Sequence, residues 1–241
     1  MENDSTYGQV IQLPRRRPLL SQSKRDASAL PSLTDLLTQT PADPSATAFL
    51  SAKLSHTTNP ILWVQDHASR RDNGHVYAPG LAGFGIRQPI LQVRVSHPRD
   101  VLWAMEEGAA CPSLSAVIGE IHGAPSALDF IATKRLALRA DGSGVPVFLL
   151  RSGDPGVLSA ARERWRITSL PSKPHPHDAR APGPGQWDVD LFRTRGRAPG
   201  RWVAWYDPDA SHTADRLHLA SCSNDGAMEK SDKPVPHSTK G

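Results

Sequence analysis

An acidic residue that ends an unbroken apolar run near the middle of the chain is the best candidate for chemistry. The run is AVIG, residues 116–119, and the acid is Glu120. A carboxylate at the tip of a buried strand can hold Mg²⁺ or orient water beside a nucleotide, as in a Walker B segment. Many buried strands also end on a charge simply because the chain is leaving the core. Glu120 is therefore a candidate nucleotide-site residue that needs a second motif beside it.

That second motif, a glycine-rich phosphate loop, is missing. Nucleotide hydrolysis needs backbone amides that cradle phosphate, with Lys and Ser or Thr completing the pattern GxxxxGK[ST]. The segment in the expected place, TQTPADPSA, has no Gly and no Lys. Pro41 and Pro44 lack amide hydrogens, and the charge of Asp43 would repel phosphate. The sequence thus predicts no Walker A motif and no cofactor, and GLAGFG at residues 80–85 fits a helix and its C-cap better than a phosphate loop.

Other catalytic signatures are absent from the sequence. His175 and His177 have a spacing that can ligate a metal ion, but no cysteine lies nearby and carboxylates are only scattered around them. No GxSxG, HExxH or Cys/His protease pattern occurs. We therefore predict no metal site and no catalytic residue.

An arginine-rich turn is the most suggestive binding surface. The segment RTRGRAPGRW carries Arg193, Arg195, Arg197 and Arg201 beside Trp202. Arginine with an aromatic neighbour suits nucleic-acid and protein interfaces equally well. A charged turn can also serve only to blunt a sheet edge. These five residues are the predicted partner- or DNA-binding residues.

A strand, a helix and a second strand occupy residues 114–151. LSAVIGEI and VPVFLLR are apolar runs typical of strands buried on both faces. Ser126 and Asp129 form a capping-box-like pair that predicts a helix start, and the helix is expected to run to about Ala140. Strand ends face the ligand crevice in open α/β sheets, so Glu120 and Arg151 should both project into it.

Further strands alternate with helices on either side of this unit. Residues 61–66 and 90–95 read as strands and residues 46–54 as a helix. Ser96 or His97 caps another helix, with Pro98 in its first turn, whereas the type of residues 32–39 is uncertain. A polar loop is expected after residue 66. Alternating strands at residues 162–169, 187–193, 201–206 and 217–219 predict an antiparallel meander. The fold class is α/β, a mainly parallel sheet flanked by helices, followed by that meander.

Composition limits how much of the chain joins the core. The 241 residues include 22 Pro and 18 Gly, 38% are hydrophobic, and the net charge is +4. We expect a disordered basic arm at residues 1–30, one domain at residues 31–220 and a disordered tail at residues 221–241. Two distant cysteines and the lack of an apolar leader or long apolar run predict a soluble, cytoplasmic protein.

Several segments together resemble the ImuA family of bacterial damage-induced mutagenesis. They are, in order, ILWVQD, YAPGL, PRDVLWAMEEG, AVIGE, LDFIATKRLAL, GVPVFLLR, LSAARERWR and RGRAPGRW, and they span about residues 61–206. The resemblance implies a RecA-like, P-loop NTPase-type core. Within that core, residues 61–66 match the strand after the nucleotide-binding helix, and Glu120 takes the Walker B acid position.

The same resemblance implies a role in SOS-induced translesion DNA synthesis. The expected partners are an ImuB-like protein, which is an inactive relative of Y-family polymerases, and an error-prone replicative-type polymerase alpha subunit, with RecA as a further candidate. The two DNA-gripping loops of RecA correspond to a short GAPS segment and to SGDPG. With no phosphate loop, we expect a noncatalytic scaffold whose DNA contact is indirect or weak, with no membrane partner. A weak ATPase that uses Glu120 and a single-stranded DNA-binding protein are the alternatives.

Overall fold

The computed structural model describes residues 32–54, 57–175, 177–178, 180–210 and 216–221. The strands are β1 (Leu33–Thr38), β2 (Ile61–Gln65), β3 (Ile90–Arg94), β4 (Ala116–His122), β5 (Val147–Ser152), β6 (Glu163–Leu170), β7 (Gln186–Thr194), β8 (Gly200–Tyr206) and β9 (Leu217–Ser221). The helices are α1 (Ser45–Lys53), α2 (His67–Asn73), α3 (Ala78–Gly83), α4 (Pro98–Ala109) and α5 (Phe130–Ser143). The predicted basic arm lies outside the described residues, as does the predicted tail after Ser221.

All of these strands form one sheet, in the order β3-β2-β4-β5-β1-β6-β7-β8-β9. Every pair from β3 to β6 is parallel, and the pairs from β6 to β9 are antiparallel. The predicted mainly parallel sheet with a C-terminal antiparallel meander is thus confirmed. The uncertain segment at residues 32–39 is β1. It lies in the middle of the sheet and pairs in parallel with β5 on one side and with β6 on the other.

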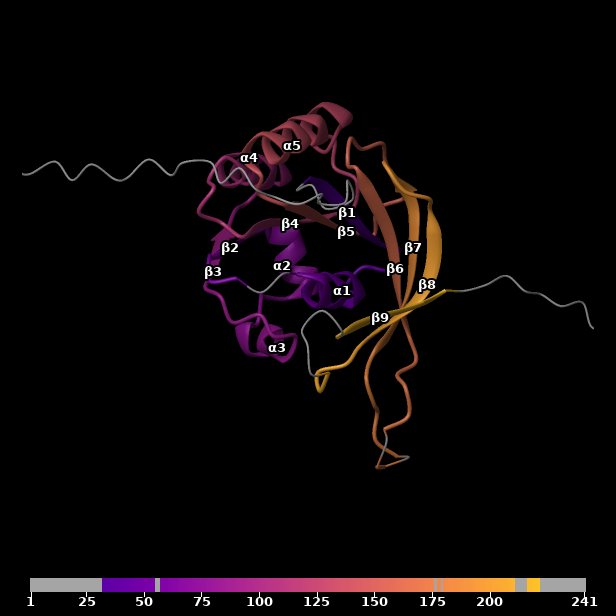
Figure 1. Cartoon of the computed structure of the whole chain (residues 1–241). Helices are drawn as coiled ribbons and strands as arrows, with labels where there is room; N and C mark the ends of the chain where they lie inside the picture. Colours follow the sequence, from indigo (N-terminus) through magenta and orange to yellow (C-terminus); the bar gives the residue numbers. More distant parts are fainter. Residues whose placement is uncertain (1–31, 55–56, 176, 179, 211–215, 222–241) are drawn as a thin grey trace, which may run out of the picture.

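Helices cover both faces of the parallel part of the sheet (Figure 1). α1 and α3 pack on one face and α4 and α5 on the other, each with its own apolar cluster. β2 shows why the strands are apolar throughout: Ile61 and Trp63 enter the α1 cluster, whereas Leu62 and Val64 enter the α4 cluster. A strand with helices on both sides has no solvent face, so the sequence run is continuous.

The helix in the central unit begins later and ends later than expected. Its N-cap is Asp129, which accepts a hydrogen bond from the Ala132 backbone N at 2.7 Å, so the expected start at Ser126 is wrong. The helix continues through residues 141 and 142 to Ser143. It ends only where Gly144 adopts a φ of 77°, in the left-handed region that glycine tolerates best.

The polar loop expected after residue 66 is instead helix α2. Asp66 is its N-cap and accepts a hydrogen bond from the Ser69 backbone N at 2.7 Å, while Gly74 with φ 79° ends it. Apolar periodicity does not predict this helix, because Ser69 is its one buried residue and no apolar stripe faces the core. An aspartate before the segment and a glycine after it were the available sequence signals.

A buried network of four charges joins β1, β5, β6 and the loop after β5. Asp35 Oδ2 accepts from Arg151 Nη1 at 2.9 Å and from Arg164 Nε at 3.1 Å. Arg151 Nε also donates to Asp154 Oδ2 at 2.6 Å, and Arg164 Nη2 donates to the carbonyl oxygen of Val157 at 2.8 Å. Asp35, Arg151, Arg164 and Asp154 are all at most 5% exposed. The charges balance, so each one depends on the others for its compensation.

Removing one charge from this network should therefore destabilise the protein strongly. Asp35→Asn keeps the volume but leaves two buried guanidinium groups facing one carboxylate, which should cost about 3–5 kcal/mol of the free energy of unfolding. Asp141→Asn is the control, because Asp141 pairs with Arg162 at 3.1 Å with both side chains 36% exposed. That exposed pair should be worth about 0–1 kcal/mol in the same denaturant titration. Equal losses in the two variants would contradict the role given to the network.

Candidate functional site

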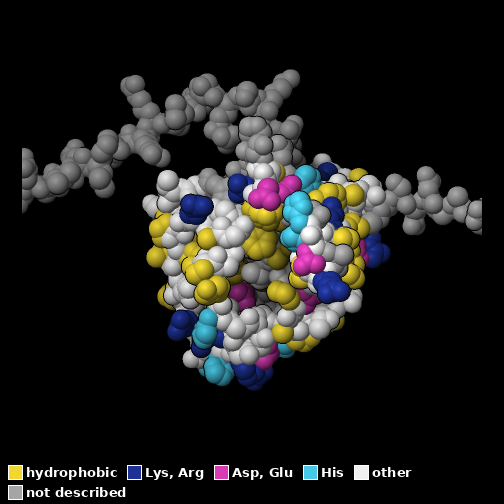
Figure 2. All heavy atoms as spheres, turned by 90° about the horizontal axis from the view of Figure 1, so that it is seen from below, with side chains coloured by type: hydrophobic (Ala, Val, Ile, Leu, Met, Phe, Trp, Pro, Cys, Tyr) yellow, Lys and Arg dark blue, Asp and Glu magenta, His cyan; other side chains and the backbone are white. Residues whose placement is uncertain are grey.

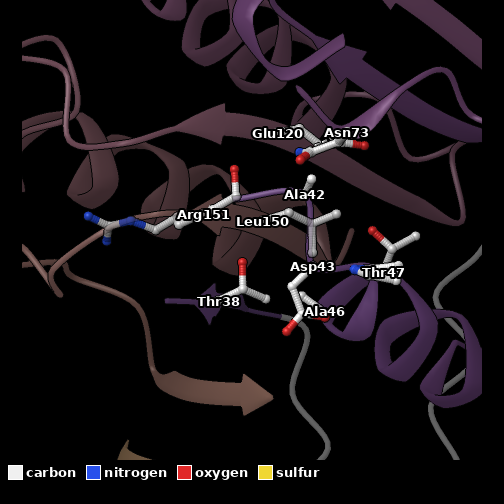
Figure 3. Close-up of a pocket in the computed structure, with 11 residues that line it drawn as sticks. Thr38, Ala42, Asp43, Ala46, Thr47, Asn73, Glu120, Leu150 and Arg151 are labelled. Carbon is white, nitrogen blue, oxygen red and sulfur yellow. Dashed lines mark hydrogen bonds between the residues drawn. The ribbon is translucent and has the colours of Figure 1, made fainter. Parts of the chain in front are cut away.

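A small pocket of about 120 Å³ opens at the carboxyl ends of β1, β4 and β5 (Figure 3). Its lining includes the loop before α1 and the last residue of α2, Asn73. A neighbouring pocket of about 210 Å³ is lined by β2, α2 and α3. The two pockets share Thr47, Asn73 and Glu120. Glu120 thus lies in the crevice where the sequence placed it.

Glu120 is buried and accepts hydrogen bonds on both carboxyl oxygens. Trp63 Nε1 donates to Oε1 at 2.6 Å, and Asn73 Nδ2 donates to Oε2 at 3.3 Å. Burial raises the pKa of Glu120 above its ordinary value, and the hydrogen bonds from Gln65, Trp63 and Asn73 offset only part of that effect. Sequence reasoning missed Trp63, Gln65 and Asn73, because their contact with Glu120 depends on the pairing of β2 with β4 and on the unexpected helix α2.

Arg151 does not join Glu120 in the crevice, so the expectation that both project there is wrong. Its guanidinium belongs to the buried network with Asp35, and Figure 3 shows its side chain directed away from Glu120. The cause is strand alternation. Val147 and Leu149 share the parity of Arg151 on β5 and pack in the α4 cluster, whereas Ile118 shares the parity of Glu120 on β4 and packs in the α1 cluster.

The loop between β1 and α1 places a carboxylate at the start of α1. Asp43 Oδ1 accepts from the Ser45 backbone N at 2.9 Å and from the Ser169 hydroxyl at 2.8 Å. Burial by itself raises the pKa of Asp43, but the hydrogen bonds from Ser45 and Ser169 outweigh it and hold the pKa below its ordinary value. Ala42 beside it has φ 61°, an uncommon left-handed conformation for a residue with a side chain. The chain's own anion therefore occupies the helix end that favours a phosphate.

Carboxyl groups are the acidic or basic side chains that face this crevice, apart from His75. Arg151 is the one Lys or Arg among the residues that line the two pockets, and its charge is used elsewhere. A site of two carboxyl groups and carboxamides, with no cation facing it, is poorly suited to a triphosphate. In the part of the chain that the structure describes, no group of three or more His, Cys, Asp or Glu residues is placed to hold a metal ion.

The arginine-rich turn joins β7 and β8 as expected, but its five predicted residues differ in their surroundings. Arg197 pairs with Glu163 at 2.8 Å and lies over the Trp165 ring, with its Cζ 5.2 Å from the centroid. Arg195 is exposed, and its side chain makes no hydrogen bond or ion pair with the described residues.

The other three predicted residues of the turn are tied to the domain. Arg193 Nη1 donates to the carbonyl oxygen of Ser159 at 3.4 Å, and Arg201 Nε donates to Asp188 Oδ1 at 2.8 Å. Trp202 is half-buried and packs against the α1 cluster. Of the five predicted residues, Arg195 is thus the one most open to a partner.

Comparison with known proteins gives two relatives. Both are curated proteins named Protein ImuA, from two strains of Caulobacter vibrioides, NA1000 and ATCC 19089. Each is 33% identical to this chain over 172 residues, a match that covers 67% of this chain and 66% of the relative. No family model matches the sequence. No helix in the described ranges is long and apolar enough to cross a membrane.

The raised pKa of Glu120 predicts a pH-dependent effect of Glu120→Gln. The pKa of Glu120 in the folded protein lies above its pKa in the unfolded chain. The stability that this difference contributes is fully present at a pH below the unfolded-state pKa, and it is lost as the pH rises through the folded-state pKa. Glutamine cannot ionise. The free energy of unfolding of Glu120→Gln relative to wild type should therefore increase from about pH 4 to about pH 8 in urea titrations.

Glu163→Gln is the matched control with the opposite sign. Burial raises the pKa of Glu163, but Lys53, Trp165 and Arg197 outweigh it and lower the pKa below its ordinary value. Its contribution is present above the unfolded pKa and lost as the pH falls through the folded pKa. Glu163→Gln should thus cost more stability at about pH 8 than at about pH 4. A flat difference for Glu120→Gln across this range would show that Glu120 ionises freely in the folded protein.

Proposed function

The chain belongs to the ImuA family, and from that premise we propose that it is a noncatalytic accessory protein of SOS-induced translesion DNA synthesis. We propose further that its core is a degenerate RecA-type domain. The proposed partners are an ImuB-like inactive Y-family polymerase and an error-prone replicative-type polymerase alpha subunit, with RecA as a third candidate. The relatives' shared name does not itself specify these partners, so the experiments below address them directly.

One observation carries the noncatalytic part of the proposal, and it is the position of Asp43. The strand β1, the following loop and α1 are arranged as a phosphate-binding unit requires, with the helix N-terminus beside the pocket of Glu120. Asp43, held there by Ser45 and Ser169, puts a negative charge where phosphate would bind. Repulsion between the two anions opposes nucleotide binding.

Nucleotide binding is tested first. ATP with Mg²⁺ at millimolar concentration should leave the Tm of the wild-type protein unchanged, because a ligand raises Tm only through its affinity for the folded state. In a strain deleted for the gene, Glu120→Gln should restore damage-induced mutation as well as wild type does. A rise in Tm with ATP, together with hydrolysis that Glu120→Gln abolishes, would favour the ATPase alternative.

Partner binding is tested at the arginine-rich turn, with two neighbouring arginines as a matched pair. Arg195→Ala should weaken association with the ImuB-like protein by about 1–3 kcal/mol, because an arginine in a protein interface is often a hot spot. It should not change Tm, since its side chain makes no polar contact with the described residues. Arg197→Ala should instead lower the stability by about 1 kcal/mol, because it breaks the ion pair with Glu163 and the contact with Trp165.

Calorimetric titration with the purified partner and thermal unfolding measure these two effects separately. If Arg195→Ala binds the partner as tightly as wild type does, the turn is not the interface. It does not protect a sheet edge either, because β8 is covered by β9. If the turn binds DNA instead, Arg195→Ala will flatten the dependence of single-stranded DNA affinity on salt by about one unit of log-log slope.

A further inference from the structure

A second and larger groove lies away from the crevice of Glu120. It has a volume of about 870 Å³. One wall comes from the end of α3 and one residue of α1. The opposite wall comes from residues 173–175 and 182–185, and the floor comes from β7, β8 and residues 207–209. Figure 2 views the molecule from below and shows this face hollowed at its centre, with hydrophobic side chains along the hollow. Its volume is near the top of the range of about 300–1,000 Å³ for ligand sites.

Packed aromatic rings make the floor firm and apolar. The Phe84 ring lies 4.9 Å from the Tyr206 ring and 6.5 Å from the Trp187 ring, measured between centroids. The Trp205 ring stacks on the His218 ring with 4.9 Å between centroids, and Lys173 Nζ lies 3.3 Å from the centroid of the Trp205 ring. Rings held in this way present a preformed apolar surface, so a ligand spends little free energy on ordering it.

Proline removes several backbone donors from the groove. Its lining includes Pro174, Pro182, Pro184 and Pro208, which have no amide hydrogen. Two of the remaining backbone donors are already used, because Lys173 N donates to the Pro184 carbonyl oxygen and Gly183 N donates to the Lys173 carbonyl oxygen, both at 2.9 Å.

Two carboxylates, Asp207 and Asp209, also line the groove. Asp209 is exposed, whereas Asp207 is partly exposed and lies 4.0 Å from His218. Lys173 is the one Lys or Arg in the lining, and its ammonium lies over the Trp205 ring. The two carboxylates therefore favour a ligand that brings hydrogen-bond donors and positive charge.

Tyr206 gives an independent indication of a ligand. Its side chain lines the groove and is 8% exposed, and its hydroxyl has no hydrogen-bond partner among the described residues. A buried hydroxyl without a partner costs free energy, which an arriving polar group can recover.

We propose that this groove binds an extended, arginine- or lysine-bearing segment of a partner protein. An apolar side chain of that segment packs on Phe84 and Tyr206, and the neighbouring cation reaches Asp207 and Asp209. Nucleic acid and anionic lipid are disfavoured because their phosphates would face these two carboxylates. The inference does not depend on a role in mutagenesis, since it follows from the lining of the groove alone.

Selection of peptides on the full-length protein tests the proposal. A phage library that displays random twelve-residue peptides is panned on immobilised wild type. The selected sequences should be enriched in arginine or lysine close to a leucine or an aromatic residue. Synthetic copies of them should bind Asp209→Lys at least about tenfold more weakly than wild type, which is the loss expected when a charge-assisted contact becomes a repulsive one.

Two further variants serve as the control and as the test of the hydroxyl. Asp178→Lys makes the same charge change on an exposed residue outside the groove lining, and it should bind the peptides as wild type does. Tyr206→Phe should bind them several-fold more weakly without any loss of Tm, because its hydroxyl has no partner to lose.

No enrichment of basic sequences, or equal binding of the selected peptides to Asp209→Lys and Asp178→Lys, would overturn the proposal. Selected peptides that are displaced by a peptide of residues 13–20 (LPRRRPLL) would instead identify the chain's own basic segment as the occupant.

Discussion

The buried charges of Asp35, Arg151, Arg164 and Asp154 set the arrangement on which the rest of the structure depends. They join three neighbouring parallel strands through contacts of 2.6–3.1 Å. Such a network adds little net stability compared with a well-packed apolar core, because each charge has lost its water. A slip of one residue in any of these strands would move a charged side chain to the opposite face and leave its partners uncompensated. The network therefore selects one register for the centre of the sheet.

The use of Arg151 in this network determines the character of the crevice on the other face. A strand residue projects to one side only, so the arginine that ends β5 cannot also face Glu120 on β4. Without a nearby cation, burial keeps the pKa of Glu120 high, while Asp43 supplies a negative charge at the start of α1. The crevice lies at the strand ends, where ligands bind in open α/β sheets, and lacks the electrostatics that bind phosphate. This is the physical basis of the proposed noncatalytic role.

The two proposed binding surfaces both lie on the antiparallel part of the sheet, and their chemistry is complementary to different partners. The turn between β7 and β8 offers the exposed donor Arg195. The groove beside Tyr206 offers apolar rings and the carboxylates of Asp207 and Asp209. A carboxylate-bearing surface fits the first, and a cationic segment fits the second. Together, the two proposals assign two different partner segments to this part of the sheet.

Local rules in the sequence determined the class of the fold, because a buried strand must be apolar on both faces and an antiparallel strand must alternate. They also placed Glu120 at a strand end and showed that the loop carrying Asp43 lacks glycine and lysine. Only the tertiary structure decided which strands are neighbours and which face each strand end uses, because pairing depends on contacts between residues far apart in the chain. The pairing of Arg151 with Asp35, the hydrogen bonds of Glu120 and the groove beside Tyr206 all arise from such contacts, and no local pattern in the sequence encodes them.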